Sequence, residues 1–199
     1  MYNQISEQSF RVKSFSIIYQ DLKNPKKTIE GNCFFIEPNK EMAFRNDGEL
    51  IEAFGIKNTE VTTESFHHLI LFNYMIGNTD WNIATQKNLK FFRKKGMDKF
   101  TVVPYDFDNC KLVDPPYMTN YPGAKREKRD NRYVLEKFHS QDELLLELMF
   151  FQKLKDDYFA ICDDCEKLKT PYKKRMKNFL KPFFKSLPKT KKMEKLFLE

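Results

Sequence analysis

The alternation of apolar and polar positions near the start of the chain predicts a β-hairpin. Residues 10–20 (FRVKSFSIIYQ) and 28–36 (TIEGNCFFI) alternate or run apolar, and the segment 24–27 (NPKK) between them has the composition of a turn. Apolar runs of this length bounded by turn residues are typical of paired antiparallel strands. A short helical piece near residues 40–45, followed by a loop, completes the expected N-terminal part.

The middle of the chain predicts a buried helix followed by a second hairpin. Residues 64–76 carry apolar side chains around most of a helical circumference, which is typical of a buried helix, and Gly77 ends the pattern. Residues 89–93 (LKFFR) and 99–104 (KFTVVP) are rich in β-branched and aromatic side chains, and residues 94–98 between them supply a turn.

The C-terminal third predicts a mainly helical structure. Ser140 and Glu143 form an S-x-x-E capping box, and the apolar run at 144–154 that follows predicts a long amphipathic helix. Thr170-Pro171 marks the start of another helix, because proline suits the first helical turn. Pro182 is expected to kink or end this helix, since it cannot donate a backbone hydrogen bond.

Composition supports one folded α+β domain with an uneven charge. The 199 residues include 20 Phe and 9 Tyr, and such bulky apolar units argue against disorder. Residues 166–199 carry 12 basic and 3 acidic side chains, a net charge of +9, so the remainder of the chain is at −2. A basic end can meet nucleic acid, an anionic membrane or an acidic partner, although a solvated helix face is the commoner reason for such a run.

Other features limit the environment in which the chain works. No stretch approaches the roughly 20 apolar residues of a membrane span, and Met1–Arg11 lacks a hydrophobic signal region, so the chain as written is expected to be cytoplasmic, without a membrane span. Cys162 and Cys165 have the C-x-x-C spacing of zinc and redox sites, but no second pair completes a tetrahedral set. Reduced, structural cysteines are therefore expected.

Polar residues around the second hairpin carry the candidate chemistry. Asp80 lies in the loop before the hairpin, Asn88 opens its first strand and Asp106 follows its second, so a tight hairpin brings all three together. Phosphoryl transfer needs oxygen ligands for Mg²⁺ and a group that orients the attacking hydroxyl, which these side chains match. Asn82 competes with Asn88 as a ligand, and Asp108 would hold a second metal or brace the loop. Ordinary turn and cap roles are the alternative for these aspartates.

At these residues the chain resembles the atypical kinases, a group that includes the spore-coat CotH-type and HipA-type proteins, and the likeness to CotH is the closest. That family has a helix ending in a G-N-x-D-W-like loop, an asparagine shortly afterwards, and a strand closing in a W/Y-D-x-D motif. The corresponding places here are held by Phe66 to Gly77, Asn78, Asp80, Trp81, Asn88 and Tyr105 to Asp108. The similarity covers roughly residues 10 to 185 and is specific in the central third.

The resemblance implies an α+β protein kinase-like fold. Residues 1–60 would be a remnant of the small lobe, formed by a β-hairpin and a short helix, and residues 61–199 a mainly helical large lobe with the catalytic hairpin at 78–108. The turn-rich segment 109–131 would be the activation segment, whose basic residues, Arg132 just after it included, would either approach phosphates or be solvated.

The resemblance further implies Mg²⁺-dependent transfer of a phosphoryl or nucleotidyl group from ATP to a protein or small-molecule acceptor. Asp80 would be the catalytic base, with Asn88, Asp106 and Asp108 as metal ligands. Glu37 would lie in the hinge that binds adenine, so it is the expected cofactor-binding residue. Relatives of this family are often exported, so the chain would be exported if an upstream leader had been lost.

Departures from the family pattern leave a second interpretation open. Eight residues separate Asp80 from Asn88, against five in the common kinase loop, and the sequence contains neither a Gly-rich phosphate loop nor a V-A-I-K-like lysine. An inactive pseudokinase, or a scaffold that binds a partner through its basic C-terminal helices, would explain both. Nucleic-acid binding is supported only by the basic tail, and we do not expect it.

Overall fold

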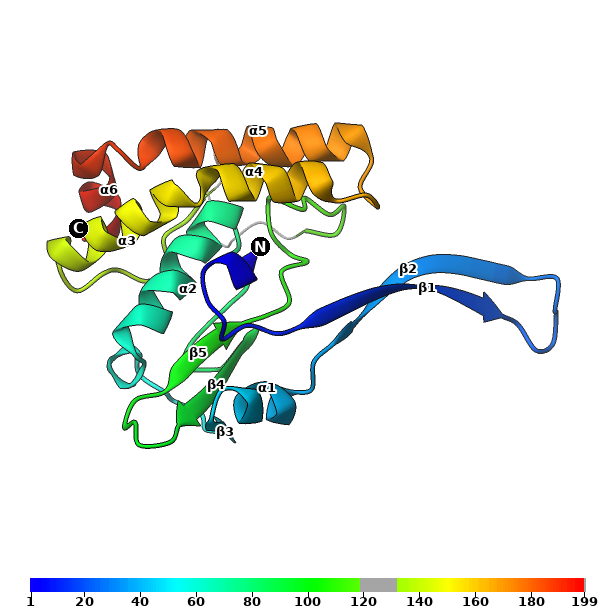
Figure 1. Cartoon of the computed structure of the whole chain (residues 1–199), viewed down its shortest axis with the longest axis horizontal. Coiled ribbons are helices and arrows are strands. Elements are labelled where there is room, and N and C mark those ends of the chain that lie inside the picture. Colours follow the sequence, from blue (N-terminus) through cyan, green and yellow to red (C-terminus); the bar gives the residue numbers. More distant parts are fainter. Residues whose placement is uncertain (119–131, 199) are drawn as a thin grey trace.

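The computed structural model describes residues 1–118 and 132–198. These residues form an α+β fold with two antiparallel sheets and six α-helices (Figure 1). The strands are β1 (Val12–Gln20), β2 (Thr28–Ile36), β3 (Gly48–Ile51), β4 (Leu89–Lys94) and β5 (Thr101–Pro104). The helices are α1 (Asn39–Arg45), α2 (Thr63–Ile76), α3 (Gln141–Lys153), α4 (Lys155–Asp164), α5 (Thr170–Ser186) and α6 (Thr190–Phe197). None of the described helices is long and apolar enough to cross a membrane.

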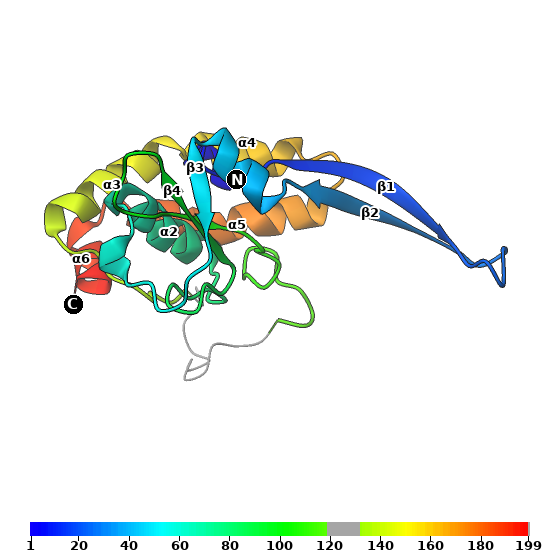
Figure 2. The same cartoon turned by 90° about the horizontal axis from the view of Figure 1, so that it is seen from below.

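Strands β1 and β2 form the expected N-terminal hairpin, which projects from the rest of the molecule (Figures 1 and 2). Their register runs from Val12 opposite Ile36 to Gln20 opposite Thr28. Because side chains alternate across a strand, one face of the hairpin carries an apolar row along its whole length. That row, which we call the apolar hairpin face, consists of Phe15, Ile17, Tyr19, Ile29, Cys33 and Phe35.

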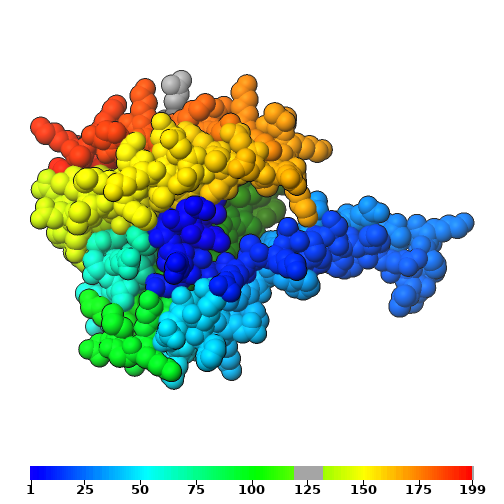
Figure 3. Space-filling model, viewed as in Figure 1, coloured from blue at the N-terminus to red at the C-terminus, as the bar shows by residue number. Residues whose placement is uncertain are grey.

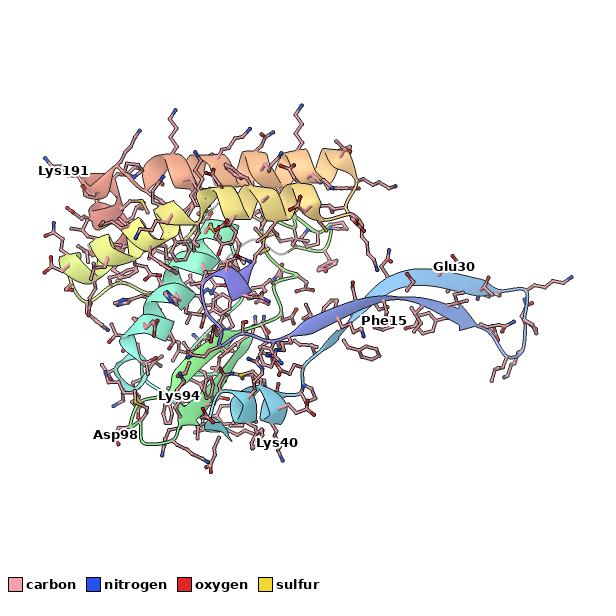
Figure 4. All side chains as sticks on the ribbon, in the orientation of Figure 1. Phe15, Glu30, Lys40, Lys94, Asp98 and Lys191 are labelled. Atoms are coloured by element: carbon pink, nitrogen blue, oxygen red, sulfur yellow. The ribbon has the colours of Figure 1, made fainter. Side chains whose placement is uncertain are left out.

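Within residues 1–118 and 132–198, no second layer covers the apolar hairpin face. Phe35 is 68% exposed and Tyr19 is 57% exposed, although Phe15 stacks on Phe35 with ring centroids 4.4 Å apart. Phe15 points away from the ribbon into open space (Figure 4). The opposite face is polar toward the tip and apolar at its base, where Val12, Phe34 and Ile36 turn toward the body of the molecule.

The second hairpin is extended by a strand that the sequence did not predict. Strands β4 and β5 pair as expected, with Leu89 opposite Pro104, and β3 adds to the other edge of β4. β3 has only four residues, GELI, too few to show a strand periodicity. Because β3 belongs to the expected 1–60 part and β4 to the 61–199 part, these two parts share one sheet.

Helix α2 forms the centre of the core and confirms the predicted buried helix. It contacts β5 on one side and helices α3 and α5 on the other, so it lies between the sheet and the helical layer (Figure 1). Leu69, Leu71 and Met75 are fully buried, which agrees with apolar side chains all around its circumference. Gly77 ends the helix in the left-handed conformation with φ at 67°.

The C-terminal helices differ from the sequence-based prediction in two places. The predicted long helix is broken at Leu154 into α3 and α4, although Ser140 caps α3 as expected by accepting a hydrogen bond from the Glu143 backbone. Pro182 lies inside α5 and does not end it, so of the two expected outcomes, a kink or an end, the second is wrong. Burial of Phe183 and Phe184 immediately after the proline favours continuation of the helix over the lost backbone bond.

Candidate functional site

The loop after α2 is held by a chain of hydrogen bonds that begins inside the helix. Asn73 is buried, and its side-chain oxygen accepts a hydrogen bond from the side-chain nitrogen (Nδ2) of Asn78 at 2.9 Å. The Asn78 side-chain oxygen in turn accepts from the Asp80 backbone N–H at 2.9 Å. Gly77 allows this path because its left-handed conformation turns the chain at the end of the helix. The position of Asp80 is therefore fixed from the core outward.

The carboxylate of Asp80 is held by two residues from the far end of its own loop. Asn88 donates from Nδ2 to the Asp80 carbonyl oxygen at 2.7 Å and to Oδ2 at 3.0 Å. Lys87 forms an ion pair with Oδ1. Since both Asn88 amide bonds use the nitrogen, the Asn88 oxygen is left as an acceptor or a metal ligand. The two predicted residues Asp80 and Asn88 are thus in direct contact.

The competing residue, Asn82, is engaged in a local turn. Its side-chain oxygen accepts from both the backbone N–H and the hydroxyl of Thr85, at 2.9 and 3.0 Å. Its backbone pairs with that of Lys87 in a short bridge, which closes the loop between Asp80 and Asn88. This geometry explains the eight-residue spacing, because the additional residues form the turn. Asn82 therefore shapes the loop, and Asn88 is the asparagine that contacts Asp80.

Asp106 and Asp108 follow directly after β5 and lie close to each other. Asp106 adopts φ at 58°, a left-handed conformation that aspartate and asparagine tolerate better than most residues. Burial raises the pKa of the Asp106 carboxyl, and the neighbouring carboxylates of Asp108 and, more weakly, Asp80 raise that pKa further. Asp108 Oδ2 accepts a hydrogen bond from the Tyr117 hydroxyl at 3.0 Å. Three carboxylates therefore interact here, and their mutual repulsion favours a cation.

The segment after the second hairpin runs alongside the end of α2. Leu112 donates its backbone N–H to the Ile76 carbonyl at 3.0 Å, and Lys111 donates to the Gly77 carbonyl at 3.2 Å. Asn78 forms an isolated antiparallel bridge with Cys110. These bonds join the loop of Asp80 to the segment that follows Asp108, although the two are about 30 residues apart in the chain.

An apolar cavity of about 450 Å³ opens next to Asp106 and Asp108. The base of the β1–β2 hairpin forms one wall and the Asp106–Val113 segment another, with the N-terminal residues between them (Figure 3). Phe107 lies within this region and packs against Phe72 and Tyr2, with ring centroids 5.3 and 6.4 Å apart. The volume of the cavity is in the range of small-molecule sites, which are mainly apolar with a few polar groups. Among its lining residues are Phe10, Val12, Phe34, Ile36, Tyr105 and Cys110.

Glu37, the residue expected to bind the cofactor, does not line this cavity. Both of its carboxylate oxygens accept hydrogen bonds from Arg45, at 2.9 and 2.8 Å, and one also accepts from the Arg11 backbone. The contact with Arg45 and the Arg11 backbone lowers the pKa of the Glu37 carboxyl, against a smaller effect of burial. The side chain thus ties α1 to the start of β1, and its cofactor-binding role stays a prediction.

Arg132, which was expected either to approach phosphates or to be solvated, contacts two helices instead. It is 8% exposed, donates a hydrogen bond to the Met75 carbonyl at 3.1 Å, and lies over the Phe179 ring. Its guanidinium therefore links α2 to α5. The other basic residues of the expected activation segment, at 125–129, lie outside the described residues.

Sequence reasoning missed the roles of four residues around the candidate site. Lys87 contacts the Asp80 carboxylate and Tyr117 that of Asp108, while Asn73 and the side chain of Asn78 position the loop. A signal for Asn73 was present, because a polar residue in an otherwise apolar helix requires a buried partner. No comparable signal exists for Lys87, which lies among the many lysines of a basic chain.

Comparisons with known proteins leave the family open. No protein-family profile, curated protein or solved structure matches this chain. Within residues 1–118 and 132–198, no three His, Cys, Asp or Glu side chains are arranged as a ready metal site. Any cation here would need the Asn88 oxygen and oxygens from a ligand as well.

Proposed function

We propose that the protein is a Mg²⁺-dependent phosphotransferase that uses ATP, with a kinase-like arrangement of its catalytic groups. The observation that carries this proposal is the apolar cavity beside a pair of carboxylates, Asp106 and Asp108, whose charge extends to Asp80. A nucleotide needs both features at once, because its base is flat and apolar on its faces while its phosphates are bound through divalent cations.

The donor set fits magnesium better than a softer metal. Asp106, Asp108 and the side-chain oxygen of Asn88 are hard oxygen donors, and Mg²⁺ sites in nucleotide enzymes commonly use one or two carboxylates together with phosphates and water. Burial raises the pKa of Asp106, and the neighbouring carboxylates of Asp108 and Asp80 raise it further, so a bound cation would favour its charged form. Bound there, the ion would neutralise the charge that develops on the transferred group.

Asp80 is the residue placed to act on the acceptor. Asn88 and Lys87 fix its carboxylate from the loop side, so its orientation is set before a substrate binds. In this mechanism the acceptor hydroxyl loses its proton to Asp80 as its oxygen bonds to the γ-phosphorus of ATP. The bond from that phosphorus to the β-phosphate oxygen breaks, and ADP leaves.

Lys87 offers the phosphate contact that the sequence left unaccounted for. Its ammonium group pairs with Asp80, and the side chain is 56% exposed, so it is accessible to a ligand beside Asp80. An incoming phosphate can share this charge with Asp80. In this proposal the adenine would lie against the base of the β1–β2 hairpin, which lines the cavity together with Asp106, and the triphosphate would be directed toward Asp106.

A thermal-shift titration tests this proposal. Ligand that binds the native state raises the unfolding temperature by mass action, so ATP with Mg²⁺ should stabilise the wild type more than ATP alone. Asp106→Asn should remove the Mg²⁺-dependent part of this rise in unfolding temperature. Asparagine is chosen because it tolerates the left-handed backbone at this position. Asp98→Asn, in the exposed β4–β5 turn, removes the same charge far from the cavity and should retain the full shift.

Asp80→Asn separates binding from transfer. This variant should keep the ATP·Mg²⁺ shift, yet lose transfer of radiolabelled γ-phosphate by a factor of at least about 10². Absence of any ATP·Mg²⁺ shift in the wild type would refute nucleotide binding. A shift with equal labelling by the wild type and Asp80→Asn would refute the role of Asp80.

A nucleotide-binding protein without transfer activity is the second candidate, and one observation favours it. The described glycines, at positions 31, 48, 55, 77 and 96, do not form a phosphate-binding loop over the cavity. If this second candidate is right, ATP with Mg²⁺ raises the unfolding temperature, but neither the wild type nor any variant transfers radiolabelled γ-phosphate. The protein would then act as a scaffold that responds to nucleotide.

A further inference from the structure

A second hollow lies on the helical layer, away from the cavity beside Asp106. It is a groove of about 440 Å³ between α3 and the corner where α5 joins α6, and it shares no lining residue with the nucleotide cavity. Its floor is mainly aliphatic, and we call it the α3–α6 groove. The residues that form it include Leu145, Leu148, Met149, Leu187, Pro188 and Thr190.

The apolar floor of the α3–α6 groove is open to solvent. Met149 is 62% exposed, and Leu146, next to the groove on α3, is 69% exposed. Leu148 and Leu187 beneath them are buried and belong to the core, so the floor is anchored on a fixed surface. Lining positions 145, 148, 149 and 152 lie along one side of α3, and the first three of them are apolar, which leaves a linear strip for a second helix.

The edges of this groove are positively charged. Lys153 lines it, and Lys185, Lys189, Lys191 and Lys192 flank it on the α5–α6 corner, where Lys191 extends outward from the end of the helical layer (Figure 4). All five are exposed, and none of them forms an ion pair with a described residue. Of the carboxylates close to the groove, Glu147 on α3 is buried and contacts His68. Glu194 on α6 accepts a hydrogen bond from the Gln141 side chain.

We propose that the α3–α6 groove binds an acidic amphipathic helix of a partner protein. An aliphatic floor takes the apolar face of such a helix, and unpaired lysines along the edges attract carboxylates on its flanks. The floor contains no aromatic ring on which a nucleobase could stack, so the surface fits a helix better than single-stranded nucleic acid. This interaction is independent of phosphoryl transfer, because it uses none of the cavity residues.

The binding test uses a designed probe. A fluorescein-labelled peptide of about 18 residues, or five helical turns, carries Leu along one face and Glu on the others. We expect saturable anisotropy with the full chain at micromolar concentration. An isomer of identical composition, with its Leu spread around the helix, should bind at least about tenfold more weakly, because it lacks an apolar face.

Two pairs of matched variants locate the contact. Lys189→Glu/Lys191→Glu/Lys192→Glu should weaken probe binding at least about tenfold, whereas Lys23→Glu/Lys26→Glu/Lys27→Glu, at the tip of the β1–β2 hairpin, changes the net charge equally and should leave it within about twofold. Met149→Gln should weaken binding, whereas Met97→Gln, on the exposed β4–β5 turn, should not. Circular dichroism confirms that each variant is folded.

Specific outcomes overturn the proposal. These are absence of saturable binding, equal affinity for the two peptide isomers, equal loss in the two lysine triples, or no loss in a folded Met149→Gln. Tighter binding of a single-stranded DNA of about 20 nucleotides at the same salt concentration, lost in the same lysine triple, would assign the surface to nucleic acid instead.

Discussion

At the scale of single residues, the candidate site is defined by neighbouring carboxylates, two of which raise the pKa of the third, Asp106. Asp106 is surrounded by other carboxylates and partly removed from water, and both effects raise its pKa. Lys87 forms an ion pair with Asp80, on the other side of the loop. The metal-free protein therefore keeps an unfavourable arrangement that a cation would relieve.

This arrangement predicts a pH-dependent gain in stability for Asp106→Asn. A carboxyl whose folded pKa lies above its unfolded value, about 3.9, destabilises the native state at higher pH, where it must be charged. Without Mg²⁺, the variant should therefore unfold at a higher temperature than the wild type at pH 7. The difference should shrink as the pH falls through the raised folded pKa, and vanish below about 3.9.

Thermal unfolding of both proteins across this pH range measures the effect. Asp98→Asn is the control, since that exposed turn residue should show no such dependence. A gain of the same size at every pH would mean that repacking, and not charge, explains it. Saturating Mg²⁺ should also abolish the advantage if the ion binds at Asp106.

At the scale of secondary-structure elements, the end of α2 decides where Asp80 lies. A Cβ at Gly77 would be 2.8 Å from the Lys111 Cβ and 3.0 Å from the Phe179 ring, and the residue has φ at 67°. Gly96, in the β4–β5 turn, has φ at 77° but has no heavy atom within 4 Å of such a Cβ. The two glycines therefore share a backbone requirement, and only Gly77 adds a close approach.

This contrast predicts different costs for two alanine substitutions. Gly96→Ala should lower the free energy of unfolding by about 1–2 kcal/mol, the usual cost of a left-handed non-glycine residue. Gly77→Ala should lose about 1–3 kcal/mol more, because α5 and the segment after Asp108 must move. Urea unfolding measures both, and equal losses would show that the Lys111 and Phe179 contacts relax without cost.

Periodicity predicted the elements well where the apolar pattern was long. The β1–β2 hairpin, α2 and the β4–β5 hairpin all follow from it, whereas β3, with four residues, did not show a pattern. Pro182 does not end α5, because the burial of its neighbours outweighs its local preference. The break between α3 and α4 has no cause that we identify in the residues around Leu154.

Candidate site residues were predictable by type, but their partners were not. His68 illustrates the limit: its ring nitrogen lies 2.7 Å from Glu147, which is 79 residues further along the chain. The Asp80–Lys87 pair was missed for a related reason, because the direction of a side chain depends on how its loop closes. Long-range contacts of this kind require the fold.

At the scale of the whole molecule, the cavity joins parts that are distant in the sequence. Val12, Phe34 and Ile36 reach it from the projecting hairpin, and Asp106 to Asp108 reach it from the body. Away from this base, the hairpin is held by little besides its own strand pairing, and isolated two-stranded hairpins are marginally stable in water. A ligand in the cavity would therefore stabilise the hairpin at its base.

Amide hydrogen exchange tests this coupling. ATP with Mg²⁺ should slow exchange at the hairpin base, residues 12–15 and 33–36, by at least about tenfold, and should change the tip at 21–27 much less. Asp106→Asn should abolish the effect. Protection confined to residues 104–113, with none in the hairpin, would show that the hairpin does not contact the ligand.

The apolar hairpin face has a practical consequence for solubility. Two protein molecules can bury the aromatic rings of this face against each other, and the open strand edges beside them offer further pairing, so concentrated samples will associate through this arm first. Replacement of Phe15 and Phe35 by serine or threonine reduces the exposed apolar area of this face and changes no residue that lines the cavity. Such a variant is the form to prepare for crystallisation.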